Sequence, residues 1–175
     1  VGVFFCPSGD RGEYNYAAGD WGVSTYYGIT GAGRPGYVRT LETSHCGNLY
    51  TDGLLFPDSK INMKKVTDGT SHTLLLAERV YELRSFFSGA WWEGGTALNP
   101  TKICTYSARN LRWPSGTPEE RGYYVRDTFA PAGRPKTVLF NDLFLGSHHP
   151  TPVQVAYGDG HVTGLSKDTD LKVLQ

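Results

Sequence analysis

The chain has 175 residues, which suits a single domain that buries a sizeable core. Its 17 basic and 17 acidic residues cancel, so the charge balance points neither to nucleic acid nor to an anionic membrane. No stretch approaches the roughly 18 apolar residues of a membrane span. The 22 glycines, 11 tyrosines and 10 prolines indicate many turns and an aromatic-rich β framework.

The first third of the chain alternates short apolar runs with turn residues. Residues 3–6 predict a short strand, and its apolar run is already under way at residue 1. Residues 7–10 predict a turn, because proline presets φ while glycine and aspartate accept turn geometry. Residues 31–36 predict an exposed loop. This glycine-rich loop does not indicate a phosphate site, since no Lys-Ser/Thr pair and no helical pattern follow it.

The middle of the chain predicts two strands. Residues 61–66 form at most one helical turn, and Asp68 and Gly69 predict a tight turn. Residues 74–79 are apolar and end in charge, which is typical of a buried strand that reaches the surface. Residues 86–92 predict another strand, because two adjacent tryptophans would face opposite sides of a sheet.

The last third contains the clearest local signal. Residues 97–135 are punctuated by prolines and show no period, so we expect a variable insertion there. Residues 153–165 predict an antiparallel hairpin, because period-two alternation continues on both sides of Asp159 and Gly160. Residues 167–175 predict a short helix capped by Asp168.

Four side chains near the hairpin are candidates for chemistry: His148, His149, Asp159 and His161. They could form a metal site or a His–Asp pair. A metal site needs converging ligands, and no Glu or Cys lies in the same stretch. We therefore assign no metal ligand. The structural interpretation is that His149 hydrogen-bonds the backbone at the hairpin entry while Asp159 forms the turn.

Asp68, Ser71 and His72 are the three residue types of a hydrolase triad. Three such residues within five positions do not readily adopt nucleophile–base–orienter geometry, which draws on distant segments. The sequence also lacks a Gly-x-Ser-x-Gly elbow. We therefore predict a turn here and assign no catalytic residue.

Two further groups of side chains have alternative interpretations. Aspartates in glycine-bearing loops are common calcium ligands, but solvated turn carboxylates are the expectation where the spacing is irregular. These aspartates are Asp10, Asp20, Asp52 and Asp68. Clustered aromatic side chains could stack on a carbohydrate, although an aromatic core face is the favoured alternative. These aromatic residues are Tyr14, Tyr16, Trp21, Tyr26 and Tyr27.

The hairpin region resembles the C-terminal signature of a large bacterial family of prepilin-like proteins. That signature runs Ser-x-His-Pro-Gly-Gly-Ala-Asn, an apolar strand, Ala-Asp-Gly and a second strand, so that nine residues separate the histidine from Asp-Gly. Ser147, His149, Pro150, Asp159 and Gly160 match it. The usual Gly-Gly after His-Pro is replaced here by Thr-Pro, and the alanine before Asp-Gly is replaced by glycine. Most members of this family are known only as a domain of unknown function, which has also been labelled solute-binding-like.

Two further stretches carry the same resemblance. Cys6, Pro7 and Ser8 match a Cys-Pro-Ser-Asp turn, with one inserted glycine before the aspartate. Asp68 and Gly69 lie in a segment that is similar to a second family signature. Together the three stretches span most of the chain, and the intervals between them match poorly.

The resemblance implies a mainly β (α+β) fold, namely the antiparallel sheet of a pilin-like globular head with short helices. Residues 1–175 would be one such domain without its N-terminal helix. The implied function is a non-enzymatic pilin- or pseudopilin-like subunit, made by prepilin-type processing and located in the cell envelope or outside the cell. It would associate with itself or with other pilin-like subunits, and would touch a membrane only through that helix. The alternatives are a solute- or glycan-binding module and, more weakly, a metal-dependent hydrolase.

The resemblance also bears on the three cysteines. None forms a C-x-x-C metal pair, and one disulfide with one odd thiol is the plain expectation for an exported protein. Family members often carry another cysteine soon after the N-terminal helix, and that cysteine would be the partner of Cys6. The resemblance therefore implies a disulfide between Cys46 and Cys104. The alternative is that all three cysteines are reduced and buried.

Overall fold

The computed structural model describes residues 4–9, 24–39, 45–80, 90–95, 100–128, 130–150 and 152–175. Its strands in chain order are β1 (Tyr26–Gly31), β2 (Val38–Arg39), β3 (Leu49–Tyr50), β4 (Leu74–Glu78), β5 (Ala90–Gly95), β6 (Pro100–Thr105), β7 (Ala108–Asn110), β8 (Tyr123–Tyr124), β9 (Lys136–Val138), β10 (Val153–Tyr157) and β11 (Val162–Leu165). Its helical elements are η2 (Met63–Lys65), α1 (Pro118–Arg121), η3 (Phe140–Asp142) and α2 (Leu171–Leu174).

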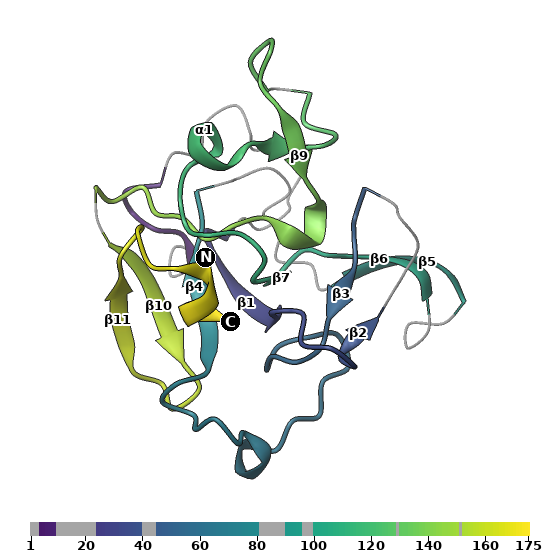
Figure 1. The fold of residues 1–175 in the computed structure, drawn as a ribbon, viewed down its shortest axis with the longest axis vertical. Coiled ribbons are helices and arrows are strands. Elements are labelled where there is room, and N and C mark those ends of the chain that lie inside the picture. Colours follow the sequence, from purple (N-terminus) through teal and green to yellow (C-terminus); the bar gives the residue numbers. More distant parts are fainter. Residues whose placement is uncertain are drawn as a thin grey trace.

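A five-stranded sheet in the order β11-β10-β4-β1-β7 organises the molecule (Figure 1). Its first three pairings are antiparallel, and β7 pairs with β1 in parallel. Three two-stranded sheets, β2-β3, β5-β6 and β8-β9, surround it. The mainly β fold class is confirmed. The parallel edge strand comes from residues 97–135, so this segment contributes to the central sheet.

The C-terminal hairpin is confirmed. Val153 pairs with Leu165 and Ala156 pairs with Val162. The turn between them contains Gly160 at φ 91°, a conformation that favours glycine. Because side chains alternate along a strand, this register gives the hairpin two distinct faces.

One face of the central sheet is buried. Tyr27, Ala77 and Val155 lie side by side on β1, β4 and β10, and each is at most 2% exposed. The helix α2 packs against this face (Figure 1). Its cap is Asp170, whose carboxylate accepts the backbone N–H of Lys172 at 2.8 Å. The prediction of Asp168 as the cap is therefore wrong by two residues.

A second core surrounds the predicted disulfide. Cys46 and Cys104 are bonded, and their Cα atoms lie 5.2 Å apart. Tyr123, Tyr124 and Phe140 pack around them. The predicted pairing is confirmed, and the third cysteine, Cys6, is a buried free thiol. Two of these aromatic residues belong to the segment that we expected to be a variable insertion.

The predictions at the N-terminal side have mixed outcomes. Residues 4–6 carry no strand, because the chain turns there and the N–H of Gly9 donates to the carbonyl of Cys6 at 2.8 Å. The single helical turn within residues 61–66 is confirmed as η2. The predictions for residues 1–3, 10–23 and 86–89 lie outside the described residues. These include Asp10, Tyr14, Tyr16, Asp20 and Trp21.

Candidate functional site

Three reactive side chains from distant segments meet beside the end of β4. The Sγ of Cys6 lies 3.3 Å from the Nε2 of His149, and this Nε2 lies 3.8 Å from the Oε1 of Glu78. All three ligand atoms lie within 4.8 Å of one another. Cys6 and Glu78 are 1% and 2% exposed, whereas the His149 side chain is 39% exposed. The cluster therefore lies under the surface with its imidazole at the opening.

The central sheet positions the cluster. Glu78 is the last residue of β4 and pairs with Tyr26 of β1. His149 lies shortly before β10, the neighbour of β4 on its other side. Cys6 arrives from the N-terminal turn, which is joined to the start of β1 by the Thr25 N–H donating to the carbonyl of Phe4 at 3.0 Å. The cluster therefore exists only when these three segments are folded together.

Each of the three residues is also oriented by a hydrogen bond of its own. The backbone N–H of Gln154 donates to the Oε2 of Glu78 at 2.8 Å, which leaves Oε1 directed at the histidine. The backbone N–H of Cys6 donates to the Oγ1 of Thr25 at 2.6 Å. The Nδ1 of His149 lies 3.5 Å from the Oγ of Ser8. Such supporting contacts fix ring and carboxylate orientation around a polar site.

Tyr26 belongs to the same cluster. Burial raises the pKa of its phenol, and the nearby charges of Cys6 and Glu78 raise that pKa further. The phenol therefore stays protonated beside the cluster.

The arrangement does not match a thiol triad. In a triad the nucleophile contacts one imidazole nitrogen and the orienting acid contacts the other. Here Cys6 and Glu78 both face the Nε2 of His149. The near-complete burial of Cys6 also denies a substrate access to the sulfur. A thiolate, an imidazole and a carboxylate facing one point are instead a set that can hold a metal ion.

The sequence-based expectations for the hairpin histidines need correction. His149 was expected to bond the backbone, but its ring faces the side chains of Cys6 and Glu78 from two other segments. Asp159 lies at the opposite end of β10 and does not approach His149. Its Oδ1 lies 2.6 Å from the Nδ1 of His161, whose ring stacks on Tyr157 with centroids 4.4 Å apart. The backbone N–H of His161, and then its ring, lower the pKa of Asp159.

Glu78 was missed as a site residue. The available signal was the charged end of an otherwise apolar strand. That signal marks only a residue near the surface end of a strand. It does not say that two residues distant in sequence will reach the same carboxylate.

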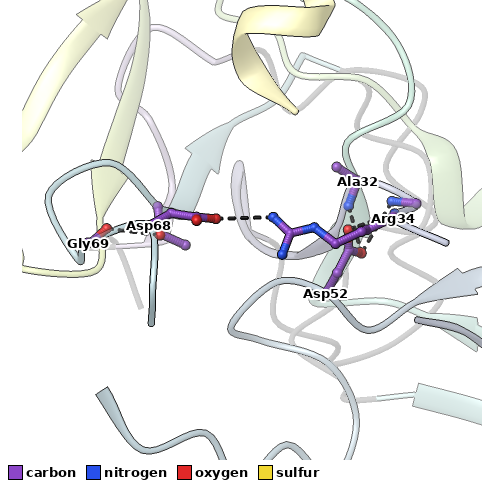
Figure 2. A network of polar contacts seen from close by, with 7 residues as sticks. Ala32, Arg34, Asp52, Asp68 and Gly69 are labelled. Carbon is purple, nitrogen blue, oxygen red and sulfur yellow. Dashed lines mark hydrogen bonds and ion pairs between the residues drawn. The ribbon is translucent and has the colours of Figure 1, made fainter. Parts of the chain in front are cut away.

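The loop aspartates Asp52 and Asp68 are held by protein partners, which argues against their use as calcium ligands. Asp52 accepts the backbone N–H groups of Ala32 at 3.0 Å, Gly33 at 3.2 Å and Arg34 at 2.9 Å. Figure 2 shows the Arg34 side chain extending from this loop to Asp68, where Nη2 lies 3.1 Å from Oδ2. Both oxygens of Asp52 are therefore engaged.

The suggested hydrolase triad does not form. The Oγ of Ser71 lies 3.2 Å from the Nδ1 of His72. Asp68 is instead the partner of Arg34, and the backbone turns between Asp68 and His72 as predicted. The side chains of Tyr26 and Tyr27 point to opposite faces of β1, so they do not form one stacking platform.

The second face of the central sheet carries exposed apolar side chains. Val162, Ala156 and Leu76 lie in one row across β11, β10 and β4. Leu55 continues this row above Gly28 of β1, where an added Cβ would meet the Leu55 side chain at 2.9 Å. Val162 is 65% exposed, Leu76 39% and Leu55 36%. We call these four side chains the apolar strip: Val162, Ala156, Leu76 and Leu55.

A pocket of about 540 Å³ opens at the Leu55 end of the apolar strip. Leu55, Phe56, Ile103 and Ala108 line it together with several small polar side chains. The volume lies within the range of small-molecule sites, which is about 300–1,000 Å³. The strip and the pocket form one continuous apolar region.

Together these features define a mainly β domain with one buried sheet face, one apolar open face and a buried polar cluster at its rim. A family described as a protein of unknown function (DUF1559) matches residues 1–172, and the chain belongs to this family. No curated protein and no solved structure matches it. Within the described residues, no helix has the length and apolar character needed to cross a bilayer.

Proposed function

We propose that the protein is a non-enzymatic pilin- or pseudopilin-like subunit whose apolar strip packs against an apolar helix of its assembly. The observation that carries the proposal is the strip itself. Exposed apolar patches on soluble domains commonly mark interaction surfaces. The prepilin-like character rests on the resemblance of the His149, Asp159-Gly160 and Cys6-Pro7 motifs.

The size of the strip suits a helix. Its four positions lie over the neighbouring strands β11, β10, β4 and β1. Three steps of about 4.8 Å between strands cover about 14 Å. A helix rises about 1.5 Å per residue, so roughly ten residues would cover the strip. The small Ala156 lets a helix approach the sheet closely, while Val162 and Leu76 flank it.

The cysteine chemistry agrees with an exported subunit. Disulfides persist mainly in oxidising compartments, and Cys46 and Cys104 are bonded in the core. The proposed location is the cell envelope or beyond it. The proposed partners are further copies of this chain or other pilin-like subunits.

A solute-binding module is the second candidate, and the pocket beside Leu55 is the observation that favours it. Among its lining residues that the structure describes, Phe56 alone is aromatic. Sugars usually stack on flat aromatic faces. An apolar solute therefore fits this pocket better than a glycan does.

The test is a charge placed in the apolar strip of the full-length protein in its own cells. Val162→Asp should strongly reduce the amount of protein that cross-links into envelope or filament fractions. Thr163→Asp is the matched control, since it places the same charge on the same exposed strand but on the opposite face. The purified domains should unfold at similar temperatures, because both sites are exposed.

Equal assembly of Val162→Asp and wild type would overturn the proposed interface. If an apolar solute stabilised the purified domain and Ala108→Trp in the pocket removed that effect, while Val162→Asp assembled normally, the solute-binding function would replace it. The two variants therefore separate the two candidates.

A further inference from the structure

We propose that Cys6, His149 and Glu78 bind one Zn²⁺ ion, which fastens the N-terminal turn to the central sheet. The sequence assigns no metal ligand, and the proposal is independent of the assembly role. It rests on the donor set, on the spacing of the donor atoms, on their burial and on the contacts that orient them.

The spacing of two of the three pairs of donor atoms fits tetrahedral zinc, and the third pair lies within 4.8 Å. With Zn–S of about 2.3 Å and Zn–N and Zn–O of about 2.1 Å, tetrahedral angles place S and N about 3.6 Å apart and N and O about 3.4 Å apart. The corresponding distances are 3.3 Å for Cys6 to His149 and 3.8 Å for His149 to Glu78. Both differ from the ideal values by less than about half an ångström, which small side-chain rotations would absorb.

The charges of the three side chains also fit a Zn²⁺ ion. A thiolate from Cys6 and the carboxylate of Glu78 supply two negative charges, and neutral His149 supplies a lone pair. Zn²⁺ therefore makes the buried cluster electrically neutral, whereas a buried charge without a counter-charge is costly. Binding releases one proton, which leaves the thiol of Cys6 as its sulfur bonds the metal.

The surrounding hydrogen bonds are those that a zinc site needs. The Nε2 of His149 faces the proposed ion, while its Nδ1 is directed at Ser8. Glu78 keeps Oε1 for the ion because Gln154 occupies Oε2. Contacts of this kind orient zinc ligands and tune the affinity of the site.

Three protein ligands leave one tetrahedral position for water. The His149 side chain is 39% exposed, so solvent and the ion reach the cluster from its side. The ion would join residues 6, 78 and 149, which lie in three separate segments. Its main effect is therefore a cross-link between the N-terminal turn, β4 and the entry to β10.

The test uses purified protein with its disulfide intact, stripped of metal by a chelator and titrated with zinc alone. Wild type should bind one zinc per chain. Cys6→Ser and His149→Gln should each lower the affinity at least 100-fold, because each removes one of three ligands. His161→Gln is the matched control, since it changes a histidine of the same hairpin outside the cluster, and it should bind zinc as wild type does.

Cobalt provides a second measurement that does not depend on stability. Co²⁺ in the site should give the visible bands of tetrahedral coordination and a near-ultraviolet sulfur-to-metal band. Cys6→Ser should lose the sulfur band. The absence of stoichiometric zinc binding by wild type, or equal binding by Cys6→Ser, would overturn the proposal. The His149 side chain is partly exposed, so His149→Gln should still fold. It serves as the test variant if Cys6→Ser does not fold.

Discussion

Among the residues that the structure describes, two cysteine–histidine clusters differ in their third side chain, which is a second cysteine in one and a glutamate in the other. In the first, the Nε2 of His45 lies 3.6 Å from the sulfur of Cys46 and 3.9 Å from that of Cys104. In the second, the Nε2 of His149 lies 3.3 Å from the sulfur of Cys6 and 3.8 Å from an oxygen of Glu78. In the first cluster the two sulfurs form a disulfide. In the second, the carboxylate of Glu78 takes the place of the second sulfur, and the three side chains could bind a metal ion.

The disulfide is a covalent cross-link, and the proposed zinc site would be a second cross-link of a different kind. The disulfide joins β6 to the segment before β3, in the core that contains Tyr124 and Phe140. The Cys6 cluster joins the N-terminal turn to the central sheet, across a sequence separation of 143 residues between Cys6 and His149. The first bond is covalent and does not depend on metal. The second depends on a metal ion, so its strength should follow the zinc concentration.

Removal of the disulfide should have the largest effect on stability. Replacing both Cys46 and Cys104 by serine opens a loop with a sequence separation of 58. The chain-entropy model gives a loss of about 4 kcal/mol in the free energy of unfolding. Urea unfolding of the double variant and wild type, both in excess chelator, measures it. A loss below about 1 kcal/mol in the free energy of unfolding would contradict the prediction that the disulfide is the stronger of the two cross-links.

Zinc removal should have the next largest effect. At a free zinc concentration 100 times the dissociation constant, binding to the native state alone adds about 2.7 kcal/mol. Thermal unfolding of wild type should therefore shift upward with zinc, whereas that of Cys6→Ser should not. The double variant without Cys46 and Cys104 should keep the zinc response, because the proposed zinc ligands lie elsewhere. A zinc response in Cys6→Ser would place the metal at another site.

Asp52 provides a cross-link without sulfur or metal. It accepts three backbone N–H groups from the loop that carries Arg34 (Figure 2). Asp52→Ala should cost about 2 kcal/mol, because removing an acceptor leaves these donors without their charged partner. Asp68→Ala should cost far less, since its bond to Arg34 is exposed. Chemical unfolding of both variants tests the order, and an equal loss would contradict it.

Local features of the fold could be predicted from the sequence. The hairpin at residues 153–165 follows from alternation around Asp159-Gly160, and β4 follows from a short apolar run. The parallel pairing of β7 with β1 could not be predicted, because residues 108–110 are too short to show a period. The cap of α2 was misplaced by two residues, since Asp168 and Asp170 are chemically equivalent candidates.

The candidate site was the least predictable part. His149 and Cys6 were both singled out, but for separate reasons and with different partners. The sequence around His149 contains neither Glu78 nor Cys6, and the fold brings both to the histidine from other segments. Ligands that converge by topology leave no spacing motif. The disulfide was expected because the family resemblance assigns Cys6 to a different partner cysteine, which leaves Cys46 and Cys104 to pair.

The smallest expected effect concerns the pair Asp159 and His161, which is the exposed counterpart of the partly buried pair Glu78 and His149. The backbone N–H of His161 lowers the pKa of Asp159 most, and the His161 ring lowers it further. A carboxyl group with a lowered folded-state pKa stabilises the fold above its ordinary pKa, and this contribution is lost as the pH falls through the lowered value.

Titration of the Asp159 carboxyl carbon by NMR should therefore give a pKa below the ordinary aspartate value. His161→Gln should raise that pKa only in part, because the backbone donor remains. A complete return to the ordinary value would show that the ring, and not the turn, controls this carboxylate. Zinc should leave this titration unchanged, since Asp159 lies at the far end of β10 from His149.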